Sequence, residues 1–497
     1  MITLSKLQNS SSCDGLVWYF FLILVSSSAV IISMAYPFAS LIFFLFLTIF
    51  GLIYFKPMIG IYLFTLVYPI DSVFIQLNLS WPDYIRIYWF EVLSVILLMV
   101  MILRYLVRYH SQDSDSPIAK TYSDRWIIFF CIAFVFWSFF TVFWLDHLDR
   151  TLFGWFKFNC LFIFILFMAI YLDSYDKFVR LMTFYCCVSV MLAIAAIYST
   201  YHIFLINYAL LVTSYFSLSV QVSLFNQPGS AYTFLKGMII GTGLSSKQEL
   251  AMFLMGGVVF ALFLIRHYKS IWIRCIFLLL ILFFETVIYQ GFVKLSILGS
   301  FIVLIFITIT VSPWRKSMIL VLTCFILLNV TAFTFSQILI PKHMKNREAT
   351  GMKIKMESGG SEYQPSSFPL RLRYWESAIE KIRESHGLGD GPDSTNWDIR
   401  TTPNANNIVL TIVAEYGVPG IFFILAAFFF IARDNYYQIF KRVQVNNTVW
   451  LLKLSLVINT ALALFQYNFD LFIWWPQLWF MVGLLWASLR LEPQTIK

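Results

Sequence analysis

Long apolar runs recur along almost the whole chain, and this recurrence constrains the fold more than any other feature of the sequence. Each run has about 17 to 25 residues, which is the length at which a helix crosses a bilayer. The chain is 60% hydrophobic and only 12% charged, whereas soluble domains carry about 25% charged residues. So many runs predict an all-α fold, in the form of a polytopic membrane helix bundle.

We expect about 12 to 14 transmembrane helices, with the lower count applying where short or paired runs form one helix. The first run lacks a small-residue cleavage site after it, so we expect it to be retained as a helix. The predicted spans are 16–34, 38–55, 58–79, 84–107, 126–145, 156–172, 178–208, 248–266, 271–290, 292–312, 317–339, 408–432, 450–467 and 471–489.

One large loop divides the chain into three parts. Residues 1–339 form an N-terminal transmembrane bundle of about 11 helices, which includes a loop over 209–247. Residues 340–407 form the large loop, with an amphipathic helix at about 369–386. Residues 408–497 form the C-terminal transmembrane helices and a short tail.

Positive residues gather in alternate connections, and this asymmetry predicts how the chain crosses the membrane. The basic connections hold Arg104, Arg108, Lys120, Arg125, Arg266, Lys269, Arg274, Arg315, Lys316, Arg433, Lys441 and Arg442. By the positive-inside rule both termini are cytoplasmic, and segments 209–247 and 340–407 face outward. The same rule explains the formal charge of +9 without a nucleic-acid partner, because the sequence has no contiguous basic face.

Ionisable residues within the predicted spans support the same polarity. They are Asp71, Glu91, Glu285, Lys294, Glu415 and Asp470. A charge near the bilayer centre costs a few kcal/mol, so such residues pair, mark a site or snorkel to the interface. Because all six lie toward the outward ends of their spans, we expect a chamber that opens outward.

The large loop contains a segment with clear helix signals. Ser366 or Ser367 can cap a helix, Pro369 suits its first turn and Gly387 can end it. The apolar residues at helical spacing are Leu372, Trp375, Ile379 and Ile382. The "GLGDGP" stretch that follows is a glycine turn whose backbone N–H groups can approach an anion, although an ordinary loop has the same composition.

Two stretches, "RLRYWESAIEKIRESHGLGDGP" at residues 371–392 and "NNIVLTIVAEYGVPG" at residues 406–420, resemble the large periplasmic loop of the O-antigen ligase and polymerase family. Members of that family carry an Arg, a Trp four residues later, an amphipathic helix and a G-x-G turn. A His-Asn pair then precedes the next membrane helix, within which two further glycines follow. The corresponding residues of this chain are Arg371, Trp375, Gly389, Gly391, Asn407, Gly417 and Gly420.

The main departure from the family pattern is Asn406, which stands where ligases have the His of the pair. The resemblance gives that His the role of the base that takes the proton of the acceptor hydroxyl. Asn has no titratable group and cannot accept this proton, although its amide can orient a sugar hydroxyl or a phosphate oxygen. Glu415, His386 and Asp390 are candidate substitutes for the base.

A second departure lies in the loop over 209–247, where family members tend to carry an Arg. Lys236 and Lys247 are the only basic residues of this loop. A lysine can bind phosphate as a point charge but lacks the bidentate fork of arginine. Lys247 also precedes an apolar helix, whose N-terminal dipole favours an anion. Anchoring at the membrane interface explains both lysines equally well.

The resemblance implies transfer of a glycan from an undecaprenyl-diphosphate-linked donor to a sugar hydroxyl, on the outer side of the bacterial cytoplasmic (inner) membrane. Cleavage of the glycosyl–phosphate bond builds negative charge on the diphosphate, which fixed positive groups can stabilise without a metal or another cofactor. Arg371, Asn406 and Glu415 are the predicted catalytic residues. The predicted substrate-binding residues are Arg373, Lys236, Lys247, Trp375, Gly389, Gly391 and Asn407.

The missing His favours a polymerase, which joins lipid-linked repeat units into an O-antigen, capsule or exopolysaccharide. The alternative is a ligase that transfers finished polysaccharide to the lipid A core or another acceptor. A transporter of lipid-linked sugar is a third interpretation, although the chain shows no internal repeat of the kind that such proteins usually have. The expected partners are donor and acceptor glycans, membrane lipid, a flippase and a chain-length regulator.

Overall fold

Helices dominate the computed structural model, as the apolar runs predict. The structure describes residues 37–69, 73–78, 84–110, 122–144, 148–201, 209–213, 218–223, 247–290, 299, 327, 330–331, 367–392, 394, 407–440, 448–467 and 476–491. The predicted spans 16–34, 292–312 and 317–339 lie wholly or mostly outside these residues.

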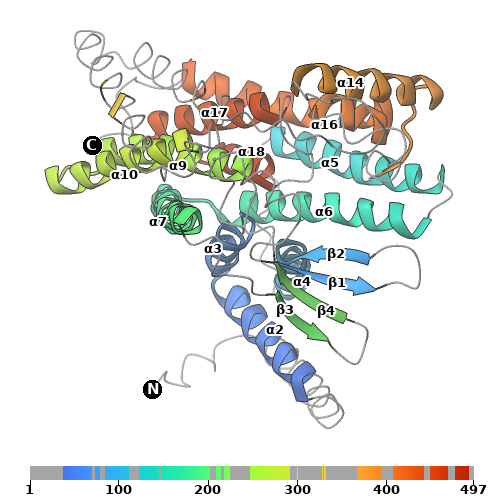
Figure 1. Cartoon of the computed structure of the whole chain (residues 1–497), viewed down its shortest axis with the longest axis horizontal. Coiled ribbons are helices and arrows are strands. Elements are labelled where there is room, and N and C mark those ends of the chain that lie inside the picture. Colours follow the sequence, from blue (N-terminus) through green and yellow to red (C-terminus); the bar gives the residue numbers. More distant parts are fainter. Residues whose placement is uncertain are drawn as a thin grey trace.

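Most of the described helices coincide with predicted spans (Figure 1). The described α-helices are α2 (Pro37–Phe55), α3 (Pro57–Val67), α4 (Trp89–His110), α5 (Tyr122–Thr141), α6 (Leu148–Tyr171), α7 (Tyr175–Tyr201), α9 (Lys247–His267), α10 (Ile271–Gln290), α14 (Ser367–Glu384), α16 (Ile408–Phe440), α17 (Thr448–Tyr467) and α18 (Pro476–Ser488). In the part of the chain that the structure describes, eight helices are long and apolar enough to cross a membrane. The protein is therefore an all-α, polytopic membrane protein, as the sequence predicts.

A small antiparallel sheet is an addition that the sequence did not predict. The predicted spans 58–79 and 84–107 contain strands β1 (Val73–Asn78) and β2 (Tyr84–Tyr88), and α4 begins only at Trp89. The two strands, "VFIQLN" and "YIRIY", are rich in the β-branched and aromatic residues that strands favour. They adjoin apolar helices, so their strand character was hidden in longer apolar runs.

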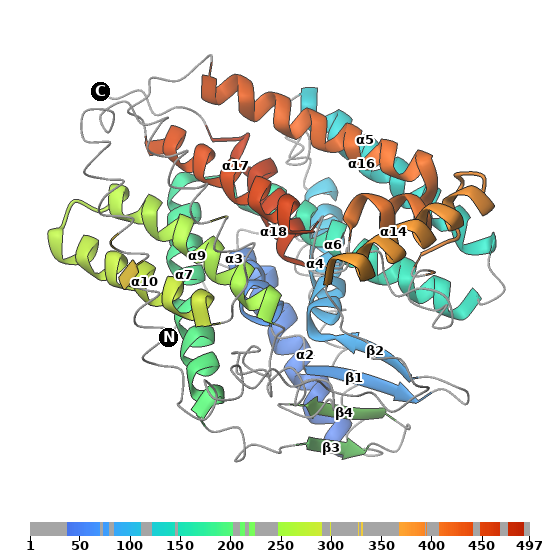
Figure 2. The same cartoon turned by 45° about the horizontal axis from the view of Figure 1, so that its top comes forward.

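The sheet connects two segments that are far apart in the sequence. β3 (Ala209–Thr213) and β4 (Leu218–Ser223) complete it, in the strand order β2-β1-β4-β3. Figure 2 shows the sheet at one end of the bundle, beside α2 and α4. This pairing brings residues 73–88 beside residues 209–223, which belong to a loop that the sequence predicts to face outward.

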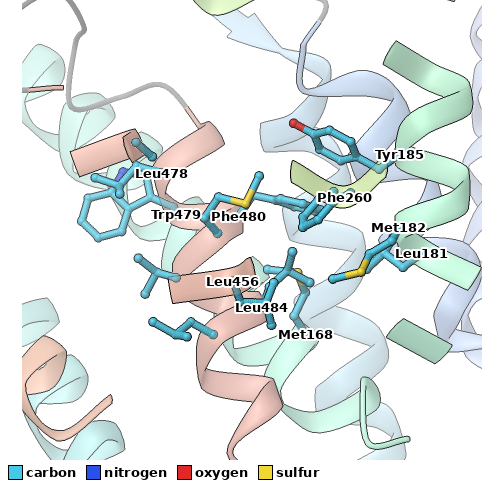
Figure 3. Packing of buried hydrophobic residues seen from close by; sticks show 14 of the residues in the cluster. Met168, Leu181, Met182, Tyr185, Phe260, Leu456, Leu478, Trp479, Phe480 and Leu484 are labelled. Atoms are coloured by element: carbon cyan, nitrogen blue, oxygen red, sulfur yellow. The ribbon is translucent and has the colours of Figure 1, made fainter. Parts of the chain in front are cut away.

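Helix α18 is the centre of the bundle, and all of its residues are buried. It lies against α6, α9 and α17, and Figure 3 shows Trp479 and Phe480 of this helix among buried side chains from its neighbours. Phe480 stacks on Tyr185 of α7 with ring centroids 5.8 Å apart. Close packing of large aromatic side chains therefore holds the helices together.

Buried polar side chains tie α18 to α5 and α16 where α18 ends. Trp486 donates its indole N–H to Asp124 at 2.9 Å, and Arg490 forms an ion pair with Asp124 at 3.8 Å. Asn435 of α16 donates to the carbonyl of Leu485 at 3.2 Å. The side chains that form this group, which we call the C-terminal latch, are Asp124, Asn435, Lys453, Trp486, Ser488 and Arg490.

Candidate functional site

The loop helix α14 packs against α16, as Figure 2 shows at the right of the bundle. Its sequence predicted an apolar stripe that includes Trp375, Ile379 and Ile382, but Ile379 is 41% exposed. Ala378 is buried instead, between the half-buried Trp375 and Ile382. The buried stripe of α14 therefore contains Ala378 in place of Ile379.

The backbone turns back on itself where α14 ends. The N–H of Gly387 donates to Ile382 O at 2.8 Å, and His386 and Gly387 both have positive φ angles, of 51° and 75°. A positive φ is uncommon for a residue with a side chain. His386 is exposed in this conformation. The glycine turn thus starts from a fixed helix end.

Helix α16 is interrupted at Gly417, whose backbone angles (φ 71°, ψ −177°) are not helical. This combination of angles is essentially restricted to glycine. Pro419 follows two residues later and has no N–H to donate to the carbonyl four residues before it, that of Glu415. The break therefore removes helical donors from carbonyl groups of the preceding turn.

The glycine turn that follows α14 supplies two of the missing donors. The N–H of Asp390 donates to Ala414 O, and the N–H of Gly391 donates to Glu415 O, both at 2.8 Å. These two N–H groups were candidates for binding an anionic substrate, but here they bind the carbonyls of α16. A role of the turn in substrate binding remains a prediction.

The two backbones meet so closely that glycine is required on both sides. A Cβ atom on Gly389 would lie 2.7 Å from a carbonyl oxygen of α16, and one on Gly417 would lie 2.6 Å from the oxygen of Gly387. Both distances are too short for a real Cβ atom. We call this contact, between residues 387–391 and 414–418, the glycine junction.

Two further hydrogen bonds complete the junction. The N–H of Val418 donates to Gly387 O at 2.8 Å. The indole N–H of Trp137, on α5, donates to the carbonyl of Tyr416 at 2.6 Å. Backbone groups that are buried normally have hydrogen-bond partners, and the junction provides them for each carbonyl from 414 to 416.

Asn407 begins α16 as its N-cap. Its side-chain oxygen accepts the N–H of Leu410 at 3.0 Å, and its carbonyl accepts the N–H of Thr411 at 2.9 Å. Asn is among the residues that cap helices best. Asn407 therefore has a structural role at the start of α16, and its predicted contact with substrate is untested. Asn406 lies outside the described residues.

Glu415 is fully buried and lies two residues before the break. Its neighbour Tyr416 is also fully buried and packs on Phe134 and Phe158, with ring centroids 5.1 Å and 5.3 Å away. The predicted base candidate thus lies at the point where α14, the glycine turn and α16 meet. Its role as a base remains a prediction.

Asp390 is the other candidate base within the junction, and it is half-buried. Burial raises the pKa of its carboxyl group above the ordinary value; nearby Lys381 acts to lower that pKa and Glu384 acts to raise it. The net shift is upward. A raised pKa brings a carboxyl group closer to the range in which a general base works at neutral pH.

The remaining predicted residues are only partly within the described structure. Arg371 and Arg373 lie on the first half of α14, and Lys247 begins α9. Figures 1 and 2 both place α9 and α14 apart in the bundle, with α17 and α18 between them. A role of Lys247 in binding the substrate remains a prediction. Lys236 lies outside the described residues.

Trp137 is the residue of this region that sequence reasoning missed. It stands in an apolar run, where an aromatic residue has no distinctive signal, and it lies 279 residues before its acceptor in the sequence. The break itself did have a signal, because "GVPG" places a proline inside an apolar helix. No group of three His, Cys, Asp or Glu residues within the described ranges could hold a metal ion.

Comparison with protein families assigns this region. Residues 278–425 match the family model described as O-antigen ligase. The match contains α14, the glycine turn, Asn407 and the break in α16, and it confirms the resemblance to the O-antigen ligase and polymerase family. A comparison with curated proteins gives no match. The chain is thus a multi-pass membrane protein with a region of the O-antigen ligase and polymerase type.

Proposed function

We propose that the protein is a membrane glycosyltransferase that polymerises undecaprenyl-diphosphate-linked repeat units into a surface polysaccharide. The observation that carries this proposal is the family match over residues 278–425, which contains α14 and the glycine junction. The reaction takes place on the outer side of the cytoplasmic membrane, where the loops over 209–247 and 340–407 are placed by the positive-inside rule.

The reaction transfers a glycan between two oxygen atoms. The acceptor hydroxyl oxygen attacks the anomeric carbon of the donor, and the bond from that carbon to the diphosphate oxygen breaks. The electron pair of the broken bond stays on the diphosphate, and the hydroxyl proton passes to a base. Fixed positive charges on the loop helix, from Arg371 and Arg373, stabilise the departing diphosphate. This chemistry requires no metal ion.

The identity of the base distinguishes this chain from the family pattern. Asn406 cannot accept a proton. A general base contributes roughly 10²- to 10⁴-fold to a rate, whereas positioning of two reactants supplies effective molarities of about 10⁵–10⁸ M. Positioning by a rigid loop can therefore sustain the reaction, with Glu415 or Asp390 at the junction as the proton acceptor.

A ligase that transfers polysaccharide to the lipid A core is the second candidate, supported by the printed description of the matching family. The absence of His at position 406 favours the polymerase, since that His is the base expected in ligases. A flippase and a chain-length regulator are the partners that a polymerase would need. Both termini would be cytoplasmic.

Deletion of the gene in its host separates the two reactions. If surface polysaccharide loses its ladder on a gel while a single repeat unit stays on the lipid core, the protein is a polymerase. If all attached sugar disappears while long polymer accumulates on the lipid carrier, it is a ligase. An unchanged profile in a host with no second copy of this activity refutes both.

A further inference from the structure

The break in α16 is held from two directions. The glycine turn approaches from the loop and bonds to Ala414 and Glu415 through backbone N–H groups. Trp137 approaches from α5 and bonds to Tyr416 through its indole. The third donor is thus a side chain from another membrane helix. A single substitution can remove this donor while the sequence of the turn stays the same.

The position of Trp137 is fixed by packing around the same carbonyl. Phe134, one turn earlier on α5, packs on the ring of the fully buried Tyr416 at 5.1 Å. Gly420 leaves room for Tyr416, because a Cβ atom there would lie 2.5 Å from Tyr416 Cβ, while Trp137 Cδ1 would lie at an ordinary contact distance of 3.7 Å. The indole thus lies against the same turn of α16 as its acceptor carbonyl.

We propose that Trp137 is a positioning residue for glycan transfer, acting through the α16 break on the glycine turn and on α14. This inference rests on the proposed function. Loss of the indole donor removes one hydrogen bond from the carbonyl of the buried Tyr416. The break would then adopt other geometries, in which the carbonyls of Ala414 and Glu415 no longer meet the N–H groups of Asp390 and Gly391.

Movement of the glycine turn would move α14, and this movement would slow the reaction. Asp390 and Gly391 connect directly to the C-terminal end of α14, the helix whose first half carries Arg371. A shift of about 1 Å in a positioning element can slow a reaction about 10²-fold. The donor lipid would still bind, so kcat falls while KM for the donor changes little.

Trp137→Phe tests the proposal, because it keeps an aromatic ring and removes the N–H donor together with the five-membered ring that carries it. The matched control is Trp450→Phe: the indole of Trp450 donates to Ile439 O at 2.9 Å, at the opposite end of α16. Both variants lose one indole hydrogen bond to a carbonyl of the same helix. General destabilisation would affect them alike.

Two readouts are compared in the full-length protein in lipid nanodiscs. The first is hydrogen exchange at the amides of Asp390 and Gly391, which needs no substrate. The second is the rate of product formation from undecaprenyl-diphosphate-linked repeat units. We expect Trp137→Phe to speed exchange at both amides at least tenfold and to lower kcat at least tenfold. We expect Trp450→Phe to change neither.

The other possible outcomes contradict either the proposal or the proposed function. Equal behaviour of the two variants overturns the proposal, and faster exchange with an unchanged kcat overturns the role in catalysis. Absence of product from the wild-type protein refutes the proposed function, while the exchange rates still decide whether Trp137 holds the junction. If Trp137→Phe does not fold, Trp137→Met provides a second variant without a hydrogen-bond donor at this position.

Discussion

The two ends of α16 are fixed by different kinds of interaction. At the glycine junction, backbone N–H and carbonyl groups of two segments meet at 2.8 Å, and the approach depends on the absence of side chains at Gly389 and Gly417. At the C-terminal latch, charged and amide side chains meet instead, around the buried pair of Asp124 and Arg490. The first end fixes the position of a loop, and the second fixes the register of membrane helices.

This difference separates positioning from stability. Because a backbone contact between glycines has few alternative arrangements, the glycine junction fixes the position of the turn. The position of α14 follows from that of the turn. A buried ion pair is costly to desolvate and is worth most when both partners are present. In the latch, Lys453 also donates to the carbonyl of Leu491 at 3.0 Å. We therefore expect damage at the junction to reduce activity and damage at the latch to reduce stability.

Gly417→Ala should have the largest effect. An alanine at φ 71°, ψ −177° costs up to about 3 kcal/mol in backbone strain. Its methyl group would also displace the turn, whose three hydrogen bonds contribute about 1 kcal/mol each. We expect the rate of product formation to fall by at least about 10²-fold, measured on purified protein at equal amounts of folded material.

Gly51→Ala is the control for Gly417→Ala, because no atom lies within 4 Å of a Cβ placed at Gly51 in α2. Alanine is the better helix former by about 1 kcal/mol, so this variant should be neutral or slightly more stable. Equal activity of the two alanine variants would show that the glycine junction does not position the site.

Asp124→Asn should have the next largest effect, and it should act on stability. The change leaves Arg490, which is 3% exposed, without its carboxylate partner. Removal of one member of a buried ion pair costs about 3–5 kcal/mol. We expect a lower unfolding midpoint in detergent, together with normal activity for each molecule that remains folded.

Lys177→Gln is the matched control for the latch. Asp173 and Lys177 form a shorter ion pair, at 2.7 Å, but their side chains are 45% and 36% exposed. An exposed pair contributes about 0–1 kcal/mol, so burial rather than distance sets the size of the effect. If the two substitutions lower the midpoint equally, the latch is not the stabilising end of α16.

Asp390→Asn should have the smallest effect on stability, and the sign of that effect depends on pH. Because burial raises the pKa of Asp390 in the folded protein, the folded state binds this proton more tightly than the unfolded state. The carboxyl group therefore adds stability below its ordinary pKa, and that stability is lost as pH rises through the folded pKa.

The variant without this carboxyl group should gain stability relative to the wild type as pH rises from the ordinary pKa of a carboxyl group through the raised pKa of folded Asp390. The side chain is half-exposed, so solvent screening limits the gain to a midpoint shift on the order of 1 °C. Thermal unfolding at a series of pH values checks this. A variant that loses stability relative to the wild type as pH rises would contradict the direction of the pKa shift.

Local sequence patterns predicted the helices of this fold but not the contacts between distant segments. The apolar runs gave the membrane bundle, and the serine, proline and glycine around α14 gave the loop helix. The pairing of β1 with β4 and the bond from Trp137 to Tyr416 join residues more than a hundred positions apart. Such contacts depend on how whole helices pack, which no short pattern encodes.

The glycines of the junction show the same limit of prediction from sequence. Gly389, Gly391 and Gly417 were singled out through the resemblance to the O-antigen ligase and polymerase family, and the structure does bring them together. The resemblance did not reveal that Asp390 and Gly391 donate to the carbonyls freed by the break in α16. Glycine is suited both to an N–H group that binds an anion and to one that donates to a carbonyl. Only the geometry therefore distinguishes these two roles.

Product formation by the purified protein tests the central claim most directly. Wild-type protein, Arg371→Ala and Arg383→Ala are each supplied with undecaprenyl-diphosphate-linked repeat units, and the products are separated by length. Arg383 is the control because it is an exposed arginine in the last turn of the same helix. We predict a ladder of products from the wild type and from Arg383→Ala, and a loss of about 10²–10³-fold for Arg371→Ala. Equal ladders from the two variants, or no product from the wild type, would contradict the account.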